Sequence, residues 1–142
     1  CRELGVVIAP TGAGKSMILV HLGSEALKLG KTVVHYTLEL ADTVVGQRYD
    51  SCITDVPLQD LNYSKQIVID RIKDIPGKLI IKEYPTKSAS TRTIKNHIEK
   101  LKKKGIYPDL ILVDYADLLR PISSSTEKRH ELERTTCYCT RK

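Results

Sequence analysis

The residues best suited to chemistry in this sequence lie in one short glycine-rich segment, APTGAGKS at residues 9–16. Gly12 and Gly14 can adopt backbone angles that a Cβ would penalise, so successive N–H groups can turn inward around phosphate oxygens. Lys15 supplies a cation there, and Ser16 offers a hydroxyl to the Mg²⁺ ion that accompanies a nucleoside triphosphate. The segment therefore predicts a phosphate-binding loop whose binding residues are Thr11, Gly12, Ala13, Gly14, Lys15 and Ser16.

The loop departs from the usual G-x-x-x-x-G-K-[ST] pattern at its first position, which holds Ala9 instead of glycine. That position closes the loop and does not touch phosphate through a side chain, so a methyl group is the mildest replacement. The flanking sequence predicts the elements that such a loop needs. An uninterrupted apolar run at residues 4–8 predicts a buried strand before it. Apolar residues on one broad face predict a helix from residue 16 to residue 29, stopped by Gly30.

The rest of the chain alternates strands with helices. Three further runs rich in β-branched or apolar residues predict strands, at residues 32–37, 78–83 and 109–113. Helical spacing of apolar residues predicts helices at residues 42–51, 64–73 and 90–104. Parallel neighbouring strands need crossover helices, so this alternation predicts an α/β fold with a parallel, doubly wound sheet.

Local capping residues and a change in composition set the expected boundaries. Asp42 is expected to cap the helix that it begins, and Gly105 to end the helix at residues 90–104. We expect residues 1–120 to form the α/β core. Residues 121–142 are expected to form a loop, a charged helical segment and an irregular tail.

The composition is that of a globular domain. At 142 residues, with 41% hydrophobic and 28% charged residues, the chain can bury a core. No apolar run approaches the length of a membrane span and no leader-like segment opens the sequence, so we expect a cytoplasmic protein without a membrane partner. The net charge of +6 is compatible with a nucleic-acid partner. Cysteines at four positions lack the paired spacing of a zinc site and are expected to be unpaired thiols: Cys1, Cys52, Cys137 and Cys139.

Two carboxylates follow predicted strands at the place where a ligand of a parallel α/β sheet lies, outside the carboxyl ends of the strands. Asp114 follows the strand at residues 109–113 and can bind Mg²⁺ directly or through water, opposite the Ser16 hydroxyl. Glu39 follows the strand at residues 32–37, and a carboxylate near the γ-phosphate can orient the attacking water or accept its proton. The residues alone leave open whether Glu39 is a general base or an exposed glutamate before a helix.

Four segments occur in an order that resembles the RecA-like ATPase core of DnaB-type replicative DNA helicases, above all the bacteriophage members. They are APTGAGKS, TLEL at residues 37–40, EYPT at residues 83–86 and LILVDYADLL at residues 110–119. The resemblance implies that Glu39 is the catalytic base, that Lys15 acts at the phosphates and that Asp114, followed by Tyr115, binds the metal. Arg48 is a loose match to an arginine in the helix after the Glu motif. ATP and Mg²⁺ are the implied cofactors.

The same resemblance implies the biological role. Members of this family couple ATP hydrolysis to movement on single-stranded DNA as homo-oligomers, and the full-length protein is expected to be a hexamer. A γ-phosphate sensor, an arginine finger and most DNA-binding loops are expected beyond residue 142, so this chain alone should hydrolyse ATP weakly. Two alternatives stay open. One is a RecA-like or KaiC-like recombination or regulatory ATPase without unwinding activity, and the other is a nucleotide-binding but catalytically silent fragment.

Overall fold

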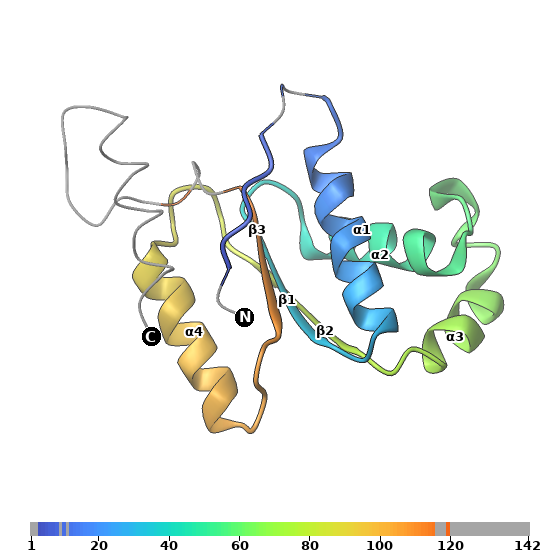
Figure 1. Cartoon of the computed structure of the whole chain (residues 1–142). Coiled ribbons are helices and arrows are strands. Elements are labelled where there is room, and N and C mark those ends of the chain that lie inside the picture. The colour runs from blue at the N-terminus through green and yellow to red at the C-terminus, as the bar shows by residue number, and fades with distance from the viewer. Residues whose placement is uncertain (1–2, 9, 11, 116–118, 120–142) are drawn as a thin grey trace.

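The computed structural model describes residues 3–8, 10, 12–115 and 119, which contain a three-stranded parallel sheet with helices on both faces (Figure 1). The strands are β1 (Thr32–Thr37), β2 (Lys78–Glu83) and β3 (Leu110–Asp114), in the order β2-β1-β3. The helices are α1 (Lys15–Lys28), α2 (Asp42–Thr54), the short 3₁₀ helix η1 (Leu58–Asp60), α3 (Lys65–Lys73) and α4 (Thr91–Lys103). This arrangement confirms the predicted α/β fold with a parallel sheet.

The register of the sheet places the last residues of the three strands side by side. Thr37 at the end of β1 lies opposite Glu83 in β2 and opposite Asp114 in β3. The carboxyl ends of the strands and the beginning of α1 all lie at the upper end of the molecule in Figure 1. Side chains from distant parts of the sequence therefore meet at one edge of the sheet.

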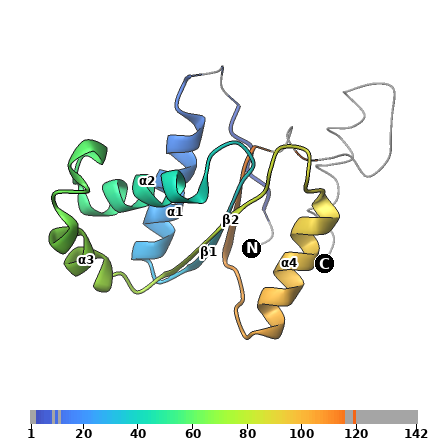
Figure 2. The same ribbon diagram turned by 180° about the vertical axis from the view of Figure 1, so that it is seen from behind.

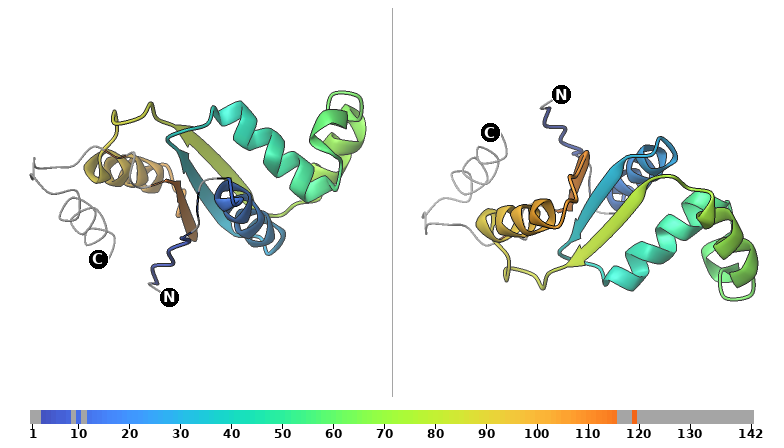
Figure 3. Two further views of the ribbon diagram at one scale, coloured as in Figure 1. Left: turned by 90° about the horizontal axis from the view of Figure 1, so that it is seen from above. Right: turned by 90° about the horizontal axis from the view of Figure 1, so that it is seen from below.

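The alternation of side chains along β1 divides the core into two layers. Val33 packs against α1 and α2, in the cluster that also holds Val20 and Tyr49. Val34 and Tyr36 pack on the opposite face, in the cluster that α4 completes. Figure 3 shows the same division, with α4 on one side of the sheet and α1 and α2 on the other. α3 lies beside α2, far from α4 (Figure 2).

The helix α1 ends at Gly30, as the sequence predicted. Gly30 has a φ of 75°, and its N–H donates to the Leu27 carbonyl at 3.0 Å. The N–H of Lys31 donates to the Ala26 carbonyl at 3.0 Å, so the helix ends in a Schellman motif. Gly105 ends α4 in the same way, with a φ of 76°.

One predicted strand is absent. Residues 4–8 lie next to the loop before α1, but they have no regular structure and are all exposed. Ile8 is 90% and Val6 67% exposed. An apolar run forms a buried strand only where both of its faces are covered. The described helices cover β1, β2 and β3 and leave this segment uncovered, so the prediction of a buried strand here is wrong for this structure.

Boundaries of α2 and β3 also differ from the predictions. The N-cap of α2 is Ala41, so Asp42 is the first helical residue and not the cap, and α2 continues past residue 51 to Thr54. β3 is shifted by one residue and includes Asp114. Asp109 instead pairs with the start of β1, where its carboxylate accepts a hydrogen bond from the Thr32 N–H at 2.8 Å. Ala9, Thr11, the expected boundary at residue 120 and the tail at residues 121–142 lie outside the described residues.

Candidate nucleotide-binding site

The loop before α1 has the backbone conformation that its glycines predicted. Gly12 has a φ of 79° and Gly14 a φ of 85°, in the left-handed region that residues with a Cβ rarely adopt. The Ala13 N–H donates to the Pro10 carbonyl at 3.3 Å, which closes a tight turn. Lys15 Nζ donates to the same carbonyl at 2.9 Å, so the ammonium lies across the loop.

The N-terminus of α1, which follows this loop directly, carries the partial positive charge of the helix dipole and can attract an anion. Gly14 is the N-cap, and the first turn of the helix contains no acidic residue. The positive end of the helix dipole is therefore not neutralised by a local carboxylate. Ser16 lies in the same turn and is half-buried.

Asp114 lies at the end of β3 and is only 2% exposed. Leu110 and Leu112 pack in the α1–α2 layer, so Asp114, two residues further along the strand, lies on the face that carries α1. Carboxylate and hydroxyl oxygens are the ligands that Mg²⁺ prefers, so Asp114 and Ser16 have the right chemistry to hold the ion. Among the described residues, no cluster of three or more His, Cys, Asp or Glu side chains could form another metal site.

Glu39 lies on an exposed bend directly after β1. The Thr37 hydroxyl shapes this bend, because it donates to the Leu40 carbonyl at 2.7 Å and accepts from the Leu40 N–H at 3.1 Å. The bend is joined to β3 by the Leu38 N–H, which donates to the Asp114 carbonyl at 2.9 Å. The backbone that carries Glu39 is thus bonded directly to the residue predicted to bind the metal.

Glu83 has a structural role that the sequence did not predict. Its carboxylate accepts a hydrogen bond from the Asp42 N–H at 3.0 Å, so it caps the beginning of α2. No local signal in the sequence points to this contact, because the sequence predicted Asp42 as the cap, whereas the structure places Ala41 at the N-cap, where its side chain cannot accept a hydrogen bond. Glu83 is directly opposite Thr37 in the sheet, which brings its carboxylate within reach.

A buried polar pair lies in the α1–α2 layer below the site. His35 Nδ1 and the Tyr49 hydroxyl share a hydrogen bond of 2.9 Å, and His35 is 1% exposed. Burial lowers the pKa of His35 to about 4, and the charge of Asp114 partly opposes that shift. Burial also raises the pKa of the Tyr49 phenol. Both side chains are therefore neutral near pH 7.

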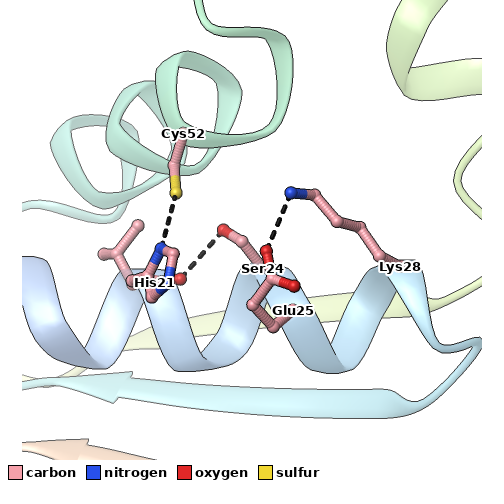
Figure 4. Close-up of polar contacts among 6 residues, drawn as sticks. His21, Ser24, Glu25, Lys28 and Cys52 are labelled. Carbon is pink, nitrogen blue, oxygen red and sulfur yellow. Dashed lines mark hydrogen bonds and ion pairs between the residues drawn. The ribbon is translucent and has the colours of Figure 1, made fainter.

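Three other residues singled out in the sequence lie outside the glycine-rich loop. Arg48 is in the middle of α2 and Tyr115 follows β3, and both are half-buried. Cys52 is a free thiol on α2, 3.8 Å from His21 Nδ1 on α1 (Figure 4). Figure 4 also shows the ion pair of Glu25 with a lysine one turn along α1, at 2.8 Å. The contact of Cys52 with His21 joins α2 to α1.

The glycine loop at the start of α1 and the parallel sheet that ends beside it place the chain in the class of α/β proteins with a P-loop-type fold, as a partial RecA-like core. No family model matches the chain. In sequence it is 33% identical over 126 residues to a DnaB-like replicative helicase of Enterobacteria phage T4, an alignment that covers 82% of this chain and 26% of that protein. The chain is therefore related to the DnaB-like replicative helicases, as its motifs predicted, and it spans about a quarter of the length of this relative.

Solved structures agree on the fold. A DnaB-like replicative helicase, described with its interactions with primase, matches 89% of this chain with a TM-score of 0.71 and 14% identity, over 32% of its own length. A second structure, of an ATPase domain, matches 89% of this chain with a TM-score of 0.70 and 14% identity, over 48% of its own length. In the part of the chain that the structure describes, no helix is both long and apolar enough to span a membrane.

Proposed function

We propose that this chain is the ATP-binding and ATP-hydrolysing motor core of a replicative DNA helicase. The observation that carries the proposal is the loop at Gly12 and Gly14, which opens α1 at the same edge of the sheet where Glu39 and Asp114 leave neighbouring strands. The relationship to the phage T4 helicase supports the choice of this activity among those that P-loop folds perform.

In this proposal the loop binds the phosphates of ATP. Backbone N–H groups of residues 11–16 surround the phosphate oxygens, and the dipole of α1 adds to their attraction. Lys15, which donates to the Pro10 carbonyl in this structure, donates to a phosphate oxygen when ATP is bound. Ser16 and Asp114 hold Mg²⁺, which when bound neutralises charge on the phosphates.

Glu39 is the proposed general base. Its bend is exposed, so a water molecule can reach its carboxylate, and its backbone is fixed to β3 through the Leu38 N–H. A carboxylate at this place orients water for in-line attack on the γ-phosphate and accepts its proton. Glu83 is the other glutamate at this edge, but its carboxylate is engaged by the Asp42 N–H.

The partners are proposed from the relative alone. The relative is described as a DnaB-like replicative helicase, and from the family that the motifs resemble we propose that the full-length protein assembles as a homo-oligomer, a hexamer, and moves on single-stranded DNA in the cytoplasm. A site completed by a neighbouring subunit would leave this chain alone a weak ATPase, because an arginine finger contributes about 10³–10⁵ in rate. No feature of the described residues favours the regulatory or silent alternatives.

A strand-displacement assay tests this function. The protein in its natural, full-length form is incubated with a forked DNA duplex and Mg-ATP, beside the Lys15→Ala variant as control. We expect the wild-type protein to release the displaced strand and the variant to release none. ATP hydrolysis without strand release would instead support a regulatory ATPase.

A further inference from the structure

The bend that carries Glu39 is held by the segment that follows β2 as well as by β3. The Tyr84 N–H donates to the Thr37 carbonyl at 3.0 Å, and the Thr86 hydroxyl donates to the Leu38 carbonyl at 3.0 Å. The Leu38 N–H is bonded to the Asp114 carbonyl on the other side. Both backbone groups of the residue before Glu39 are thus fixed, the N–H by β3 and the carbonyl by the segment that follows β2.

The chain after Glu39 is fixed in the same manner. Both backbone groups of Leu40 are bonded to the Thr37 hydroxyl, at 3.1 Å and 2.7 Å. Two residues later, the Asp42 N–H is bonded to the Glu83 carboxylate at 3.0 Å. The segment that follows Glu39 therefore reaches α2 with little freedom to shift.

The segment after β2 that supplies these contacts is itself anchored in the core. Ala89, at its end, is fully buried and packs in the same cluster as Leu38, which is 2% exposed. Ser90 then starts α4 with a capping box, in which its side chain and that of Thr93 each accept the other's backbone N–H. Thr86 thus lies between two fixed points, β2 and α4, when it contacts the bend.

We infer that Thr86 and Glu83 are positioning residues for Glu39. Neither is proposed to touch the nucleotide. Thr86 holds the backbone before Glu39 and Glu83 holds the backbone after it, so the two set the place of the Glu39 carboxylate relative to Asp114. The inference rests on the proposed function, because it assigns these contacts to the orientation of a general base.

Matched variants of Thr86 test the first contact. Thr86→Val keeps the shape and removes the hydroxyl, whereas Thr86→Ser keeps the hydroxyl. In the natural, full-length protein we expect Thr86→Val to lower kcat for ATP about tenfold or more, since small misplacements of reacting groups cost up to about a hundredfold. Its KM for ATP and its melting temperature should stay near the wild-type values, and Thr86→Ser should restore kcat.

Matched variants of Glu83 test the second contact. Glu83→Ala removes the acceptor for the Asp42 N–H, and Glu83→Gln retains an oxygen that can accept the same hydrogen bond. We expect Glu83→Ala to lower kcat and Glu83→Gln to keep most of it. Amide hydrogen exchange on the 142-residue chain, without nucleotide, should quicken at Leu38 and Leu40 in Thr86→Val and at Asp42 in Glu83→Ala.

Two results overturn the inference alone. One is a wild-type kcat in Thr86→Val and Glu83→Ala while Glu39→Gln is inactive. The other is unchanged amide exchange at residues 38–42 in both variants. A wild-type kcat in Glu39→Gln would overturn the proposed role of Glu39, and with it this inference, so the two failures are distinguishable.

Discussion

Two carboxylates at one edge of the sheet differ sharply in their surroundings. Asp114 is 2% exposed within the last residue pair of β1 and β3, while Glu39 lies on an exposed bend two residues beyond β1. A buried carboxylate at the end of a strand has a fixed position, as a metal ligand needs. An exposed carboxylate can contact a water molecule. The difference in burial is consistent with different roles for the two residues.

Substitution should separate these roles in the full-length protein. Glu39→Gln should keep Mg-ATP binding and lower turnover about 10²–10⁴-fold, because it removes the proton acceptor. Asp114→Asn should weaken the Mg²⁺ dependence of ATP binding, because it removes a charged ligand. Binding titrations with and without Mg²⁺, beside steady-state hydrolysis, measure both effects. Near wild-type hydrolysis by Glu39→Gln would show that another group is the base.

His35 gives the fold a pH dependence whose sign follows from its burial. Its pKa is about 4 in the folded chain, below the usual value of 6.5. As pH falls below about 6.5 the unfolded chain takes up a proton that the folded chain does not, so stability falls until about pH 4. The lost stability is about 3 kcal/mol at most. In the described residues His35 Nε2 has no hydrogen-bond partner, and the charge of Asp114 compensates only part of the cost of burial.

Denaturant unfolding at pH 7 and at pH 4.5 checks this prediction. The His35→Gln variant is the control, because a glutamine can accept the Tyr49 hydrogen bond and does not titrate. The wild-type protein should lose more stability than the variant over this interval. Equal losses in the two proteins would show that His35 is not the group responsible.

At the scale of the elements, two glycines inside helices should respond in opposite ways to the same change. A Cβ on Gly23 in α1 would collide with the Tyr49 hydroxyl, whereas a Cβ on Gly46 in α2 would have only an ordinary contact with Ile81. Gly23→Ala should therefore destabilise the fold by about 1–3 kcal/mol. Gly46→Ala should stabilise it by about 0.5–1 kcal/mol, since alanine favours a helix interior.

Thermal unfolding of the two variants beside the wild-type protein measures this difference. The opposite signs test the packing of α1 against α2 through Tyr49, since helix propensity alone would raise stability in both. An equally stabilised Gly23→Ala protein would show that Tyr49 does not lie against α1 as described.

The sequence predicted the elements best where one local signal decided the structure. β1 and β2 occur at the predicted residues, because their β-branched runs are bounded by turns. α1 and α4 end at Gly30 and Gly105, where positive φ values are needed. For the site, the positive φ values of Gly12 and Gly14 were predictable from the loop pattern, and the roles of the side chains there stay predictions.

The remaining features depend on contacts between distant segments. Whether residues 4–8 form a strand depends on neighbours that cover both faces, which a local run cannot reveal. The cap of α2 comes from Glu83, 41 residues after Asp42, and only the sheet register brings the two together. The contact of Thr86 with Leu38 has the same origin.

At the scale of the whole molecule, the chain holds the proposed nucleotide site at one end of a layered sheet and spans about a quarter of its phage T4 relative. In our proposal, ATP binding depends on residues within this chain. Movement on DNA depends in addition on assembly with other subunits in our proposal. The binding step is therefore the part of the account that the 142 residues can test by themselves.

Calorimetric titration of Mg-ATP into the 142-residue chain, with wild-type protein and the Lys15→Ala variant side by side, tests the central claim most directly. A charge-assisted hydrogen bond contributes about 1.5–3 kcal/mol, so the variant should bind roughly ten to a hundred times more weakly. Its circular dichroism spectrum should match that of the wild-type protein, because the Lys15 side chain belongs to neither of the two hydrophobic core clusters. Equal affinity for Mg-ATP in two folded proteins would contradict the assignment of this loop as the nucleotide site.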